Sequence, residues 1–170
     1  MVIAILAAIT IISYTGIQQR ANNVSIMTAV NQTIKVIQSY ISTTGKVPGA
    51  TNACLTYTSG CSTVSGSTFA SSSVFNENIA TAGSIPRTIP TSGSDHYGII
   101  YVYSASRVVD GNNNPIVIFY WLYGTNQACG VSGLIADPNA ASTTTTTAAS
   151  TYSNDAGSGK TLCAVAIPSP

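Results

Sequence analysis

The sequence offers one candidate catalytic pair, Asp95 followed by His96, in a chain rich in serine and threonine. His96 is the single histidine, and a histidine oriented by a carboxylate can activate a serine hydroxyl as a nucleophile. No pattern typical of a nucleophile on a sharp strand-to-helix turn accompanies the pair. We therefore predict that the protein is not an enzyme. The other acidic residues are scattered, which gives no paired carboxylates for acid–base catalysis: Glu77, Asp110, Asp137 and Asp155.

A second candidate site is the segment Asp110-x-Asn112-x-Asn114, which matches the first three ligand positions of a calcium-binding loop. The match ends there, because Pro115 stands where the loop needs a glycine and no glutamate occupies the closing position. An ordinary polar turn is the favoured interpretation. No metal and no other cofactor is predicted.

The four cysteines, none of them in a C-x-x-C spacing, favour disulfides and an oxidising compartment. Four cysteines allow three pairings. We favour Cys54 with Cys61 and Cys129 with Cys163, because each bridge would then staple a segment that otherwise looks irregular. Four buried free thiols are the alternative.

The composition predicts one folded domain with an unusual surface. The chain has 170 residues, of which 45% are hydrophobic and only 6% are charged, against about 25% charged in ordinary soluble domains. Its surface must then be built from serine, threonine, asparagine and glycine, which suits exported proteins and subunits that pack against copies of themselves. The net charge of +1 argues against strong electrostatic attraction to nucleic acid or anionic lipid.

Residues 1–12, MVIAILAAITII, are almost entirely apolar. Twelve helical residues reach only about 18 Å, which is too short for a hydrocarbon core of about 30 Å. A secretory signal is an alternative, but it would need a positive charge before the apolar run. The side chains that we predict to face the membrane or a filament are Ile3, Ile5, Leu6, Ile9, Ile11, Ile12 and Tyr14.

Residues 13–44 carry apolar side chains at spacings of three and four, as in an amphipathic helix, and Gly45 and Pro48 supply its stop signals. We predict a single helix of about 44 residues, roughly 65 Å long. Its apolar first third would protrude, so lipid or other copies of the chain must cover it. Its remainder is expected to pack on a sheet through a stripe made of Ile17, Val24, Met27, Ile34, Ile37 and Ile41.

The rest of the chain predicts a small sheet between two polar segments. Residues 47–96 suggest a long ordered loop with one short helix or strand near Val74 and Phe75. The Thr-rich tract within residues 124–159 cannot bury enough apolar area to fold alone. The strand at 115–123 is apolar on both faces, which places it in the middle of a sheet that is covered on both sides. The three predicted strands are residues 97–104, 115–123 and 162–167.

The run VIAILAAITIISYTGIQQRANN resembles the end of the amino-terminal signature of type IV pilins and pseudopilins. It is similar above all to pilin-like proteins of small-genome bacteria, whose helix continues with a Tyr-x-Gly-Ile-Gln-x-Arg-Ala pattern. The family's leader, cleavage glycine, first mature phenylalanine and near-terminal glutamate have no counterpart here, so we expect the sequence to be incomplete at its amino terminus. The residues that match the pattern are Tyr14, Gly16, Ile17, Gln18, Arg20 and Ala21.

This resemblance implies an α+β, type IV pilin-like fold: one long amino-terminal helix packed on a small antiparallel sheet, with a disulfide-bounded carboxy-terminal loop. The corresponding divisions are the helix at 1–46, an αβ-loop region at 47–96, and the sheet with its carboxy-terminal loop at 97–170.

The implied function is that of a structural subunit of a surface filament, which supports adhesion, motility or DNA uptake. The implied partners are further copies of the chain, the inner membrane before assembly and the pilus assembly machinery, with no small-molecule substrate. DNA and a host surface are further candidate partners. The alternatives are a minor or tip pilin that acts as an adhesin or DNA-binding module, and a pseudopilin of a type II-like secretion system.

Overall fold

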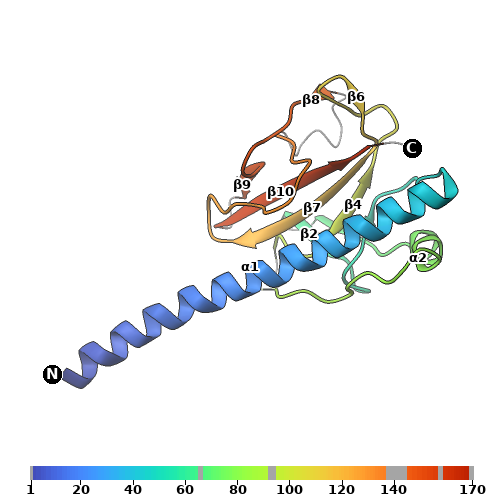
Figure 1. The fold of residues 1–170 in the computed structure, drawn as a ribbon. Coiled ribbons are helices and arrows are strands. Elements are labelled where there is room, and N and C mark those ends of the chain that lie inside the picture. Colours follow the sequence, from blue (N-terminus) through green and yellow to red (C-terminus); the bar gives the residue numbers. More distant parts are fainter. Residues whose placement is uncertain (1, 65–66, 92–94, 137–144, 157–158, 169–170) are drawn as a thin grey trace.

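The computed structural model describes residues 2–64, 67–91, 95–136, 145–156 and 159–168, and it describes the side chains of the first helix from Tyr14 onward. The chain is an α+β protein with an amino-terminal helix, a small antiparallel sheet and two disulfides (Figure 1). Its helices are α1 (Val2–Thr44) and α2 (Ser73–Ala80). Its strands are β1 (Ala53–Cys54), β2 (Cys61–Val64), β3 (Ser67–Phe69), β4 (Ile100–Tyr103), β5 (Val108–Val109), β6 (Asn112–Asn113), β7 (Ile116–Tyr123), β8 (Thr145–Thr146), β9 (Asn154–Ala156) and β10 (Lys160–Ile167).

Helix α1 is a single rod of 43 residues, as the sequence predicted. It ends at Gly45, whose positive φ of 65° lets its amide N–H donate to the carbonyl oxygen of Ile41 at 2.8 Å. The first half of the helix projects beyond the rest of the molecule, and only its second half lies along the sheet (Figure 1).

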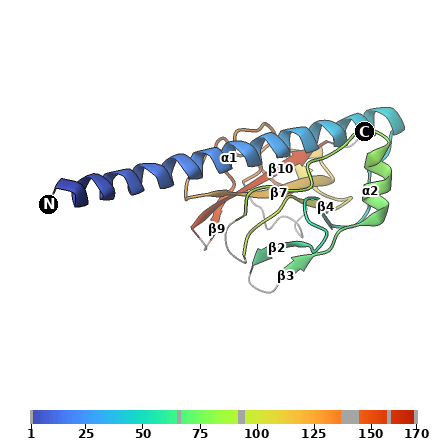
Figure 2. The same ribbon diagram turned by 90° about the horizontal axis from the view of Figure 1, so that it is seen from below.

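The main sheet has the strand order β1-β4-β7-β10-β9, and all of its pairs are antiparallel. Strand β7 lies at its centre and pairs along its whole length with β10, from Ile116 opposite Ile167 to Tyr123 opposite Lys160. The prediction of a central strand covered on both faces is confirmed. Helix α1 runs along one face of the sheet, and the hairpin of β2 and β3 lies on the other (Figure 2).

The two faces of β7 belong to two different apolar clusters. Ile118 and Tyr120 pack with the buried side chains of α1. Phe119 and Trp121 pack on the opposite face with the disulfide of Cys54. A strand with water on one side would alternate apolar and polar residues, so a nearly continuous apolar run is the direct consequence of this double cover.

The prediction of a long loop at residues 47–96 is wrong in part, because this region contains β1 and the hairpin β2–β3. The short element predicted near Val74 and Phe75 is the helix α2. Ser72 caps α2: its backbone is extended, and its hydroxyl oxygen accepts a hydrogen bond from the amide of Phe75 at 3.2 Å. Phe75 and Ile79 bury the inner face of α2. The strands were missed because pieces of two to four residues are too short to show a period-two pattern.

The candidate calcium segment forms the turn between β5 and β6. Asp110 and Gly111 both have positive φ, 47° and 82°, as in a type I′ hairpin turn. The carboxylate of Asp110 accepts a hydrogen bond from the amide of Ala148 at 3.2 Å, and the side-chain amides of Asn112 and Asn114 donate to backbone carbonyls of the same turn. These side chains hold a polar turn together.

Part of the Thr-rich tract pairs with the hairpin of β5 and β6 that contains this turn. Strand β8 pairs in parallel with β5, and Ile135 forms a bridge with Ala148. Strand β9 pairs with the start of β10. Residues 137–144, which include the first two of the five consecutive threonines, lie outside the described residues.

Candidate functional site

One face of helix α1 forms one side of the main core. Ile26, Val30 and Ile37 are at most 1% exposed, and they pack with the inner face of the sheet and with α2. Thr33 is fully buried on the same face. Its hydroxyl donates to the carbonyl oxygen of Ala29 at 2.8 Å, so this polar group is satisfied within the helix.

The opposite face of the helix is apolar and exposed. Tyr14, Ile17 and Val24 are 68%, 66% and 58% exposed, and Ala21 is exposed between them. Each of the four lies nine positions before a buried residue, as Ile17 lies before Ile26. Nine positions are two and a half turns of a helix, so the exposed residues point away from the buried ones. We call Tyr14, Ile17, Ala21 and Val24 the outer seam.

The outer seam corrects the predicted packing stripe, because Ile17 and Val24 do not pack on the sheet. Between Ala21 and Val30 the apolar residues stand three positions apart, at 21, 24, 27 and 30. Each such step falls about 60° short of a full turn, so the series crosses from one side of the helix to the other. The other four residues of the predicted stripe are buried or partly buried: Met27, Ile34, Ile37 and Ile41.

Six of the predicted membrane or filament residues belong to helix α1, and their side chains lie outside the described part of the structure: Ile3, Ile5, Leu6, Ile9, Ile11 and Ile12. The seventh, Tyr14, is the first residue of the outer seam. Among the described residues, no helix combines the length and the apolarity that are needed to cross a membrane.

Polar contacts attach the helix to the sheet where the exposed half meets the packed half. The side chain of Asn23 pairs with the backbone of Tyr123: its Nδ2 donates to the carbonyl oxygen at 3.0 Å, and its Oδ1 accepts from the amide at 2.8 Å. Gln19 donates to the same carbonyl oxygen at 2.7 Å. We call this set the Asn23–Tyr123 clamp. Gly124 lets Gln19 approach, because a Cβ at Gly124 would overlap the amide nitrogen of Gln19.

Replacing Asn23 by alanine should lower the free energy of unfolding by about 1–3 kcal/mol. Asn23 is 5% exposed, and the change removes the side-chain acceptor of the Tyr123 amide and one of the two side-chain donors to the Tyr123 carbonyl oxygen. Urea unfolding followed by the fluorescence of the single tryptophan, Trp121, measures the change. Asn31→Ala is the matched control: Asn31 is exposed, and its side-chain amide donates within its own helix, to the carbonyl of Met27. Equal unfolding midpoints for the two variants would contradict a structural role of the clamp.

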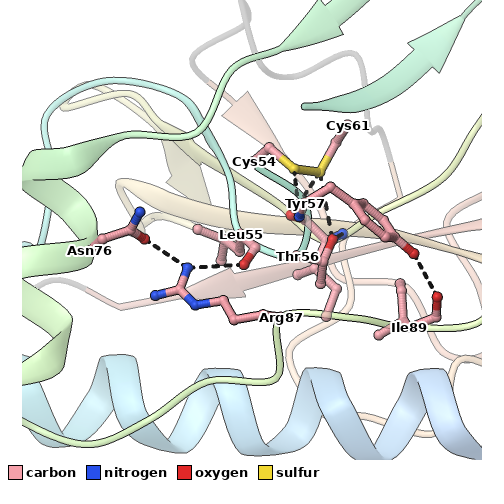
Figure 3. The surroundings of a disulfide bond; sticks show 9 residues. Cys54, Leu55, Thr56, Tyr57, Cys61, Asn76, Arg87 and Ile89 are labelled. Atoms are coloured by element: carbon pink, nitrogen blue, oxygen red, sulfur yellow. Dashed lines mark hydrogen bonds between the residues drawn. A yellow bond between two sulfur atoms is a disulfide. The ribbon is translucent and has the colours of Figure 1, made fainter. Parts of the chain in front are cut away.

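Both favoured disulfides are present. Cys54 is joined to Cys61 across seven positions, and Cys129 is joined to Cys163 across 34 positions. The first bridge closes the turn after β1 (Figure 3). The second ties the start of the Thr-rich tract to the middle of β10, opposite Tyr120, whose hydroxyl donates to the carbonyl of Cys129 at 2.8 Å.

The Asp95–His96 pair lies against the end of the sheet. Lys160, only 8% exposed, donates from its ammonium group to the carbonyl oxygens of Asp95 and His96, at 2.8 and 3.0 Å. The imidazole of His96 packs edge-on against Trp121, with ring centroids 5.8 Å apart. Burial lowers the pKa of His96, and the nearby charge of Lys160 lowers it further. The pair thus takes part in joining the segment before β4 to β10.

No protein family, no curated protein and no solved structure was found to match this chain.

Proposed function

We propose that this protein is a structural subunit of a type IV pilus-like surface filament and that its fold is of the type IV pilin kind. Its helix would lie in the inner membrane before assembly. The pilus assembly machinery would then transfer it into a bundle of helices from other copies, with the sheet facing outward. No catalytic activity is part of this proposal.

The outer seam carries the proposal. Burying a large apolar side chain is worth roughly 1.5–3 kcal/mol, and Tyr14, Ile17 and Val24 leave most of that contribution unused in the isolated chain. The apolar run of residues 1–12 precedes them directly, and Arg20 is the one charged residue in the first 34. A helix of this kind is favoured to bury its projecting half in lipid or against sister helices.

Introducing charge into the outer seam should abolish filament assembly and leave the globular part folded. We expect Ile17→Glu/Val24→Glu to remove the chain from filaments in a bacterium that has a type IV pilus machine and expresses the complete open reading frame. Each buried carboxylate would have to be desolvated in the helix bundle without a partner. Sheared surface material, examined by electron microscopy and immunoblotting, measures the result.

Gln18→Glu/Ser25→Glu is the matched control, because it adds the same charge at two exposed positions that flank the seam, each about 100° around the helix from Ile17 or Val24. It should assemble better than the seam variant. Assembly of the seam variant at the level of the unmodified chain would contradict the proposal, as would an unmodified chain that stays in the membrane fraction. Trace amounts in sheared material would favour a minor or tip pilin, and complete absence of surface fibres would favour a secretion pseudopilin.

A further inference from the structure

A cavity of about 400 Å³ opens beside the Cys54–Cys61 disulfide. Its walls come from three separate parts of the chain: the turn after β1, helix α2, and the segment that carries Arg87 (Figure 3). The volume falls in the range of small-molecule binding sites. Hydroxyl and amide side chains dominate its polar lining, and besides Tyr57 they are Thr56, Thr58, Ser59, Ser71, Asn76 and Thr88.

The one charged group in the lining is the guanidinium of Arg87. Its Nη1 donates to the carbonyl oxygen of Leu55 at 3.2 Å and to the side-chain oxygen of Asn76 at 2.7 Å, so two parts of the wall hold it in place (Figure 3). Within the described part of the chain no carboxylate pairs with Arg87. A guanidinium has five N–H donors, so a fixed, uncompensated cation with donors to spare lies at the cavity.

Tyr57 forms an aromatic wall at the other end. Its hydroxyl donates to the carbonyl of Ile89 at 2.5 Å, and its ring packs edge-on against Tyr97 with centroids 5.6 Å apart. These contacts fix the ring and occupy its polar end. The disulfide fixes the turn on which Tyr57 stands, since its amide contacts the sulfur of Cys54 at 3.4 Å.

We propose that this cavity binds a sugar acid, that is, a small polyhydroxylated ligand with a single carboxylate. A lone arginine suits a monoanion, and its fork geometry matches a carboxylate. The serine, threonine and asparagine side chains both donate and accept hydrogen bonds, as the hydroxyl groups of a sugar require. The ring of Tyr57 covers an apolar face. The site is separate from the outer seam, so the proposal does not depend on filament assembly.

Titration of the full chain with glucuronate, followed by ligand-observed NMR in a polyoxyethylene detergent, tests the proposal without a competing sugar headgroup. We expect glucose, which lacks the carboxylate, and acetate, which lacks the hydroxyls, to bind at least about tenfold more weakly than glucuronate. Inorganic phosphate is the third comparison. Binding of phosphate more tightly than glucuronate, or equal binding of glucose and glucuronate, would overturn the assignment.

Two variants locate the binding at this cavity. Arg87→Gln should weaken glucuronate binding about tenfold, and Arg20→Gln, which removes an exposed arginine outside the cavity lining, should leave it unchanged. Ser59→Trp keeps Arg87 and fills the cavity from an exposed position, so it should abolish binding even if Arg87→Gln disturbs the fold. Undiminished binding of glucuronate by Ser59→Trp would overturn the proposal. Because the cavity is separate from the outer seam, we expect Ser59→Trp to assemble into filaments like the unmodified chain.

Discussion

Replacing both Cys129 and Cys163 by alanine is expected to lower the free energy of unfolding by about 4 kcal/mol. The bridge spans 34 positions, and the loss of chain entropy in the unfolded state grows with the length of the closed loop. The bridge also holds the start of a tract with little apolar area of its own onto β10. Urea unfolding followed by the fluorescence of Trp121, which is 5% exposed, measures the effect.

The matched control is the double alanine variant at Cys54 and Cys61. That bridge spans only seven positions, so its removal should cost about 2.5 kcal/mol by the same reasoning. Both sites are fully buried, which makes the packing changes similar. A smaller loss for the Cys129/Cys163 variant than for the control would contradict the argument from loop length.

Replacing Gly98 by alanine is expected to cost at least about 3 kcal/mol, because two penalties add. Its φ of 96° lies in a region that side chains rarely adopt. A Cβ there would overlap the sulfur of Cys61 and lie 2.8 Å from the Cβ of Cys61, so the disulfide or the strand beside it must move. The unfolding midpoint and the yield of oxidised protein, from thiol titration, both report the effect.

Gly111→Ala separates these two penalties. Gly111 also has a positive φ, 82°, but a Cβ there meets nothing within 4 Å. Its replacement should cost only the backbone strain of about 1–2 kcal/mol. If Gly98→Ala were no more destabilising than Gly111→Ala, close packing of the disulfide against the backbone of Gly98 would not be the cause.

The sequence predicted those elements whose signal extends over many residues. The long helix follows from its uninterrupted spacing of apolar residues and from Gly45 at its end, and α1 ends within a residue of that glycine. The central strand follows from eight consecutive apolar residues in β7. The cysteine pairing was favoured because each bridge would staple a segment that otherwise looks irregular, and both bridges are present.

The face of the helix that packs on the sheet could not be predicted from spacing alone. Steps of three and four residues look equally helical, but only their mixture decides whether a stripe stays on one side. Asn23 is polar, yet it is buried because its side chain pairs with the end of β7. Its partner, Tyr123, is 100 positions away in the chain, and no local pattern marks such a pair.

The cavity beside Cys54 was also beyond prediction. Arg87 bonds to Leu55 and Asn76, which lie 32 and 11 positions away. Arg87 and Leu55 lie outside the helices and strands, and Asn76 lies in the short helix α2. The sequence shows only that cations are rare in this chain, six in 170 residues. Their rarity makes an arginine without a carboxylate partner in the described structure worth testing, but it does not place the arginine in a cavity.

The Asn23–Tyr123 clamp has a mechanical consequence. Strand β7 lies beside the second half of helix α1, with its axis nearly parallel to the helix axis and its direction opposite (Figure 1). Tension on the projecting end of the helix would enter the sheet at Tyr123 and pull β7 lengthwise between β4 and β10. Under such shear the hydrogen bonds that join β7 to β4 and to β10 resist the force together. A pull across the strands would break the same bonds one after another. We therefore expect the fold to withstand a larger force along the axis of α1 than across its strands.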